Sequence, residues 1–153
     1  MKRRTFLKGT VASGMLGVAA SAGLLSPRMV LAAWPESAFA ATKVDDAISN
    51  LYGSSKTSES GDIKIKAPDI AENGAVVPIT VSTDMKASSI AVLISENPSP
   101  LACSYELGGN TAGFISCRVK MGKTSDLIAV VKSGGKLHST TRKIKVTIGG
   151  CGG

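Results

Sequence analysis

The alternation of apolar and polar residues divides the chain into a leader, a helical segment and a long β-rich region. Residues 11–25 are an apolar, small-residue stretch. In residues 34–52 apolar residues recur at helical spacing, with Asp45-Asp46 near the start and Gly53 as a stop signal. The apolar positions are Val44, Ile48, Leu51 and Tyr52. This pattern predicts a short amphipathic helix that covers a sheet or a partner, followed by a loop over residues 53–61.

Short strands separated by turn residues are expected in the rest of the chain. Residues 63–66 alternate strictly, and the continuously apolar residues 90–94 predict a central strand. Pro78 predicts a sheet edge or a bulge. The expected strands are residues 63–66, 76–81, 90–94, 101–107, 114–121, 127–131 and 137–148, with a wide hairpin loop at 108–113. Seven strands at this spacing predict an all-β, immunoglobulin-like antiparallel β-sandwich over residues 61–148, preceded by the helical segment and loop at 33–60.

The last expected strand runs directly into a glycine-rich end. Ile144, Val146 and Ile148 share one face of that strand, and Lys143, Lys145 and Thr147 share the other. A single thiol follows in residues 149–153, because Cys151 stands between Gly149-Gly150 and Gly152-Gly153. Glycine permits conformations closed to other residues, so this sequence predicts a flexible arm that places the thiol about 10 Å beyond the strand.

A thiol on a slim arm fits a deep site on another protein better than chemistry within its own domain. An exposed cysteine is only a few per cent thiolate at neutral pH, and the arm has no adjacent cation to change that. Activation is therefore expected from the site that the arm enters, which describes a covalent carrier. The alternatives are a frayed tail or a coupling tag. Prenylation is not expected, because its signal has three residues after the cysteine.

The N-terminus carries an export signal. Arg3-Arg4-Thr5-Phe6-Leu7-Lys8 is a twin-arginine pattern, and the apolar stretch after it is too short and too rich in Gly and Ala for a good membrane span. Residues 1–32 are expected to be a cleaved Tat signal peptide, with a membrane anchor as the alternative. The Tat route carries folded proteins, so a periplasmic protein that folds before export is expected.

Removing the leader changes the charge balance. The whole chain has 18 basic and 11 acidic residues, for a net charge of +7. Five basic residues lie in the leader, so the mature chain has 13 basic residues against 11 acidic ones, a net charge of +2. No basic run is interleaved with aromatic residues, which argues against nucleic-acid binding. The clusters Arg142-Lys143-Lys145 and Lys120/Lys123 are interpreted as a solvated face that could also steer anions.

Two further cysteines lie on the two strands of the expected hairpin. If that hairpin folds about Asn110, Cys103 and Cys117 fall opposite each other, and an exported protein permits a disulfide between them. The alternative is two buried thiols acting as small hydrophobic residues. Either way Cys151 stays unpaired, as a reactive thiol or an intermolecular partner. Three cysteines and one histidine without a Cys-x-x-Cys motif do not predict a metal site.

Catalysis by the chain itself is not expected. His138 is the one histidine, and a Cys–His pair would require the arm to fold back onto its own domain. The chain has no Gly-x-Ser-x-Gly motif, no phosphate-binding loop and no carboxylate pair at a telling spacing. No catalytic residue and no cofactor are therefore predicted.

With these residues in view, the chain resembles the SoxY family, the sulfur-carrier subunits of the Sox thiosulfate-oxidising system. The terminal motif 149–153 is the most specific feature of the resemblance, and the twin-arginine leader alone is not specific. Further matching segments are Ala33-Trp34-Pro35, Ala38-Phe39, residues 71–78, Glu96-Asn97-Pro98 and Arg118-Val119-Lys120. Cys103 and Cys117 depart from the pattern, because this family usually has only the terminal cysteine.

The resemblance implies an immunoglobulin-like domain, a periplasmic heterodimer with SoxZ, and covalent attachment of sulfur intermediates to Cys151. It also implies transient contacts with three enzymes. The haem protein SoxXA conjugates thiosulfate to the thiol, the hydrolase SoxB removes sulfate, and a molybdenum-containing sulfane dehydrogenase, where present, oxidises the remaining sulfur. No nucleic acid and no stable membrane anchor are expected.

Three other functions stay open at this point. A ubiquitin-like sulfur carrier would use Gly152-Gly153 as a terminal thiocarboxylate, although such proteins are cytoplasmic and the leader argues against one. A structural β-sandwich subunit would have an incidental tail. A thiol-dependent enzyme would turn over substrate alone, which a carrier does not.

Overall fold

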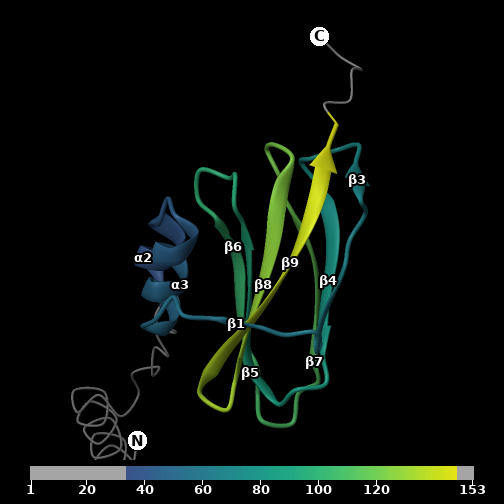
Figure 1. Cartoon of the computed structure of the whole chain (residues 1–153). Helices are drawn as coiled ribbons and strands as arrows, with labels where there is room; N and C mark the ends of the chain where they lie inside the picture. Colours follow the sequence, from purple (N-terminus) through teal and green to yellow (C-terminus); the bar gives the residue numbers. More distant parts are fainter. Residues whose placement is uncertain (1–33, 148–153) are drawn as a thin grey trace, which may run out of the picture. The chain divides into compact units, whose positions relative to one another are not determined.

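The computed structural model describes residues 34–147, and those from Pro35 onward belong to one compact unit (Figure 1). Two short helices begin this part of the chain, α2 (Glu36–Ala40) and α3 (Val44–Tyr52). Ala41 has an extended conformation and separates them. Gly53 ends α3 with a φ of 81°, and its N–H donates to the Ser49 carbonyl at 2.7 Å. The predicted helix and its stop signal are confirmed. Gly53 can end the helix because glycine adopts this left-handed conformation without strain.

Nine strands follow within the described residues, and they form two sheets. The strands are β1 (Ser58–Glu59), β2 (Ile63–Lys66), β3 (Ile70–Ala71), β4 (Val77–Thr83), β5 (Ala87–Ile94), β6 (Leu101–Glu106), β7 (Gly113–Val119), β8 (Ser125–Ser133) and β9 (Lys136–Val146). The larger sheet has the order β1-β9-β8-β5-β6, with β3 also paired to β9, and the smaller has the order β2-β4-β7. The β-sandwich is confirmed, and all seven predicted strands are present.

The core lies between the two sheets. Ile90, Val92 and Ile94 of β5 are fully buried in it, and they meet Ile79 and Val81 of β4 from the smaller sheet. Because successive side chains of a strand point to opposite faces, the intervening residues of β5 must find a second apolar environment.

The helices supply that second environment. Ala91 and Leu93 of β5 and Val130 of β8 are fully buried in a separate cluster with Ala47 and Ile48 of α3. The larger sheet is therefore covered on both faces, which explains why residues 90–94 are apolar without alternation. The amphipathic helix covers the chain's own sheet (Figure 1).

The predicted hairpin between residues 101–107 and 114–121 is wrong. β6 pairs with β5 in the larger sheet, whereas β7 pairs with β4 in the smaller one. The connection between them crosses from one sheet to the other. A local pattern shows that each segment is a strand, but it does not show which strand is its neighbour, because hydrogen bonding between backbones is the same for every partner.

Pro78 lies in the middle strand of the smaller sheet, at a point where that strand has one neighbour. β2 pairs with β4 only from Thr80 to Thr83, and Pro78 is opposite Arg118 of β7. The proline thus lies at a local edge, as predicted, since it has no N–H to donate to a second strand.

Candidate functional site

The predicted working residues lie outside the described part of the chain. These are Cys151, the glycines Gly149, Gly150, Gly152 and Gly153, and the leader residues Arg3 and Arg4. The structure does describe the point from which residues 148–153 continue, namely Lys145, Val146 and Thr147, which we call the arm base. The described part of the candidate site consists of the residues that hold the arm base in place.

The arm base is bonded on both sides. On one side β3 pairs with β9 in parallel, and the N–H groups of Lys145 and Thr147 donate to the carbonyls of Asp69 and Ala71 at 2.9 and 3.0 Å. On the other side the Val146 N–H donates to the Thr124 hydroxyl at 3.0 Å. Figure 1 shows β3 beside the end of β9. Hydrogen bonds on both flanks therefore define the position of the arm base.

Arg142 ties the same strand to the other sheet. Its Nη1 donates to the Ile65 carbonyl of β2 at 3.1 Å, and its Nη2 to the Asp69 carboxylate at 2.7 Å. Arg142 is thus half-buried, with 37% of its side chain exposed, whereas its neighbours Lys143 and Lys145 are exposed as expected. The sequence did not indicate the contacts of Arg142, because its acceptors are more than 70 residues away.

Gly74 packs against the arm base from the segment that follows β3. Its carbonyl accepts from the Met121 N–H at 2.7 Å. A Cβ at this position would lie 2.8 Å from Val146 Cγ1 and would also overlap the Met121 carbonyl. Only glycine leaves room for these two neighbours, so the Asn73-Gly74 sequence does more here than make a turn.

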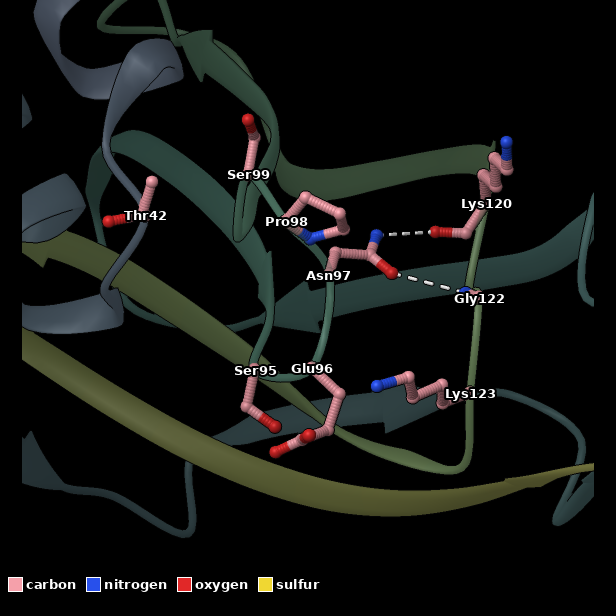
Figure 2. Close-up of a pocket in the computed structure, with 9 residues that line it drawn as sticks. All are labelled: Thr42, Ser95, Glu96, Asn97, Pro98, Ser99, Lys120, Gly122 and Lys123. Carbon is pink, nitrogen blue, oxygen red and sulfur yellow. Dashed lines mark hydrogen bonds between the residues drawn. The ribbon is translucent and has the colours of Figure 1, made fainter.

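A hollow of about 960 Å³ lies next to this end of the sandwich, between the β5–β6 and β7–β8 turns (Figure 2). The Asn97 side chain joins the two turns, because its Nδ2 donates to the Lys120 carbonyl at 2.7 Å and its Oδ1 accepts from the Gly122 N–H at 3.1 Å. Lys120, Lys123 and Glu96 supply the charges of the hollow. Lys123 directly precedes Thr124, so this polar surface borders the arm base.

Cys103 and Cys117 are close together, although not as hairpin neighbours. Their Sγ atoms lie 3.8 Å apart, and both residues are free, half-buried thiols. Burial is the main cause that raises the pKa of Cys103 to about 12, and the nearby Cys117 adds to it. The structure thus contains a dithiol, and the predicted disulfide stays a prediction.

His138 lies too far from the arm base to pair with Cys151. It stands near the start of β9, nine residues before Thr147, which is about 30 Å at the usual rise of a strand. Four residues beyond Thr147 span at most about 14 Å. Because Thr147 is bonded to Ala71, a Cys–His nucleophile within one chain is out of reach.

The described residues contain no group of three or more His, Cys, Asp or Glu side chains that could hold a metal ion. In the same part of the chain no helix has the length and apolar character needed to cross a membrane.

Comparison with known families decides where the chain belongs. The family described as sulfur oxidation protein SoxY matches residues 48–151, a stretch that includes the whole sandwich and ends at Cys151. The chain belongs to the SoxY family.

A solved SoxY structure supports this membership. The sulfur carrier protein SoxY from Chlorobium limicola f thiosulfatophilum is 45% identical, with a TM-score of 0.63 over 69% of this chain and 97% of that one. Two other solved structures are only distantly similar. The human F-spondin reeler domain has 12% identity over 60% of this chain and 92% of that one, with a TM-score of 0.43. Bacteroides uniformis beta-glucuronidase has 11% identity over 56% and 10%, with a TM-score of 0.40. A comparison with curated protein sequences found no match.

Within this SoxY-family fold, the sequence did not reveal the residues that fix the arm base. Asp69, Ala71 and Gly74 lie near the start of the sandwich, and Thr124 is in the turn before β8. Two of these residues, Ala71 and Gly74, lie in the segment 71–78, which carried part of the SoxY resemblance. The sequence did not show what this segment does, because its position beside β9 is a property of the tertiary structure.

Proposed function

We propose that this protein is a sulfur carrier that holds thiosulfate-derived intermediates on the Cys151 thiol and presents them to partner enzymes. The observation that carries the proposal is the extent of the family match, which runs through the sandwich and ends at Cys151. The solved relative, described as a sulfur carrier protein, is 45% identical over nearly its whole length.

The mechanics of the described residues support a carrier. The arm base is bonded to β3 on one side and to Thr124 on the other, so the fold fixes the point at which the arm begins. A thiol four residues beyond Thr147 has a reach of at most about 14 Å. A fixed origin and a short reach raise the local concentration of the thiol at a docked partner without a large loss of entropy.

The proposed chemistry is supplied by partners. Oxidative conjugation joins the Cys151 thiolate to the outer sulfur of thiosulfate, giving Cys–S–S–SO₃⁻, and the two electrons released pass to the haem partner SoxXA. Hydrolysis by SoxB then consumes one water and releases sulfate and two protons, leaving a persulfide on Cys151. A molybdenum-containing sulfane dehydrogenase, where present, oxidises the remaining sulfur. The chain contributes the thiol and no cofactor.

The proposal includes export and a stable partner. The twin-arginine leader at Arg3-Arg4 supports Tat export to the periplasm, and SoxZ is the proposed heterodimer partner. Export of a folded protein suits a domain whose core is complete within the described residues.

Intact mass spectrometry of the protein purified from thiosulfate-fed cells tests the proposal. Reductant-labile additions of sulfur or thiosulfate-derived groups are expected on wild type, and Cys151→Ser should abolish them. The matched control is the double variant Cys103→Ser/Cys117→Ser, which should retain them. Unmodified Cys151 under all conditions would favour a structural subunit, and sulfur retained in the Cys151→Ser variant on the terminal glycine would favour the thiocarboxylate mechanism.

A further inference from the structure

The two sheets of the sandwich meet differently along their two sides. On one side, Arg142 of β9 in the larger sheet binds the Ile65 carbonyl of β2 in the smaller sheet. On the other side the edge strands are β6 and β7, and there the Cys103 and Cys117 thiols meet at 3.8 Å. The cysteines thus stand where a covalent bond would join the sheets.

The geometry suits a disulfide. An S–S bond is about 2.05 Å long, so the sulfurs need to approach by only roughly 1.8 Å from where they lie. Both thiols are partly exposed at the edge, which leaves them accessible to a reagent in solution. Neither sulfur would need to cross the core, because each strand is the outermost of its sheet.

We infer that Cys103 and Cys117 are a redox pair that forms a disulfide between the two sheets by exchange with an external disulfide. One cysteine attacks the external disulfide as its thiolate, which gives a mixed disulfide and releases the first external thiol. The second cysteine then attacks the protein sulfur of that mixed disulfide and releases the second thiol. Two protein thiols are oxidised and one external disulfide is reduced to two thiols, so atoms and electrons balance.

The pair should exchange faster in mildly alkaline solution than at neutral pH. Burial, and then the nearby Cys117, raise the pKa of Cys103 to about 12, which keeps this thiol protonated near neutral pH. Exchange needs a thiolate as the attacking group, so its rate should rise with pH.

The bond has two consequences. It closes the segment between β6 and β7, which limits the unfolded chain and stabilises the sandwich. It also removes two thiols that would compete with Cys151 for oxidants and sulfur compounds. The second consequence rests on the proposed carrier function, whereas the bond itself does not.

The full-length mature protein with Cys151→Ser isolates the pair. We expect glutathione disulfide at about pH 8 to lower its mass by about 2 Da, the loss of two hydrogens, and to prevent alkylation of Cys103 and Cys117 after denaturation in urea. Dithiothreitol should restore two alkylated thiols. Peptide mapping should identify the crosslink, and the midpoint of thermal unfolding should rise on oxidation by on the order of 10 °C.

Two single-thiol variants test whether the bond needs both cysteines. Cys103→Ser and Cys117→Ser, each combined with Cys151→Ser, should lose the decrease in mass of about 2 Da and take up at most one glutathione. Two glutathiones on the Cys151→Ser protein, or two thiols still alkylated after oxidation, would overturn the inference. Neither result depends on cargo attachment to Cys151, so the carrier proposal and this one can fail separately.

Discussion

Gly74 and Val146 lie side by side at the end of the sandwich, where a Cβ on Gly74 would stand 2.8 Å from Val146 Cγ1. Val146 belongs to the arm base, and Gly74 follows the short strand that pairs with it. A residue more than 70 positions earlier in the chain thus helps to set where the C-terminal arm begins.

Gly74→Ala should therefore destabilise the protein. The added methyl group overlaps the Met121 carbonyl and Val146, so backbone must move, at a cost of about 1–3 kcal/mol in the free energy of unfolding. Urea denaturation of the mature protein measures this. Gly61→Ala is the matched control, since nothing lies within 4 Å of a Cβ there, and it should be nearly neutral. Equal stability of the two variants would contradict the packing described at the arm base.

The two hydrogen-bond partners of Arg142 should contribute unequally to the free energy of unfolding. The Asp69 carboxylate is 85% exposed, so Asp69→Asn should cost less than about 1 kcal/mol. Arg142→Ala also removes the donor to the Ile65 carbonyl and the contacts of a half-buried side chain, and should cost about 1–2 kcal/mol. Chemical denaturation at low and high salt separates the two, because only the Asp69 contribution should weaken with salt. A larger loss from Asp69→Asn would refute this division.

The buried hydroxyl pair of Tyr52 and Ser89 should show coupling. Their oxygens lie 2.7 Å apart, and Ser89 is fully buried beneath α3. Tyr52→Phe leaves the buried Ser89 hydroxyl unpaired and should cost about 1–2 kcal/mol. Ser89→Ala should cost less, because the Tyr52 hydroxyl also bonds Ser104, and the double variant should cost less than the sum. Thermal unfolding of the four proteins completes the cycle. Strict additivity would show that the hydrogen bond contributes nothing.

The reduced protein should lose stability in alkaline solution. Burial raises the pKa of Cys103 from 9.0 to about 12 in the folded state, so the folded protein keeps this proton when the unfolded chain has lost it. The contribution to stability is complete below pH 9.0 and falls as the pH rises toward 12. Denaturant midpoints measured in dithiothreitol across this range test the effect, and Cys103→Ser should reduce it. A decline should persist in that variant above pH 10, because burial also raises the pKa of Tyr52.

Local pattern was enough to find most elements of this protein. The strict alternation at residues 63–66, the helical spacing before Gly53 and the continuous apolar run at 90–94 each match an observed element. These patterns succeed because the period of the side chains along a helix or strand is a property of the backbone itself. The terminal motif was likewise recognised from the sequence alone. So was the resemblance to the SoxY family, which the comparison confirmed.

Tertiary structure alone decided how those elements pair. Residues 101–107 and 114–121 have good strand patterns, yet they lie in different sheets, which placed Cys103 against Cys117 across the sandwich instead of along a hairpin. Arg142 likewise found its acceptors on β2 and at Asp69. The physical reason is that backbone hydrogen bonds accept any strand as a neighbour, and the choice depends on burying both faces of the larger sheet at once. Burial of both faces involves residues that are far apart in the chain, so no short segment of the sequence can predict it. The sequence therefore determined the elements and the motif, and packing determined which elements are neighbours.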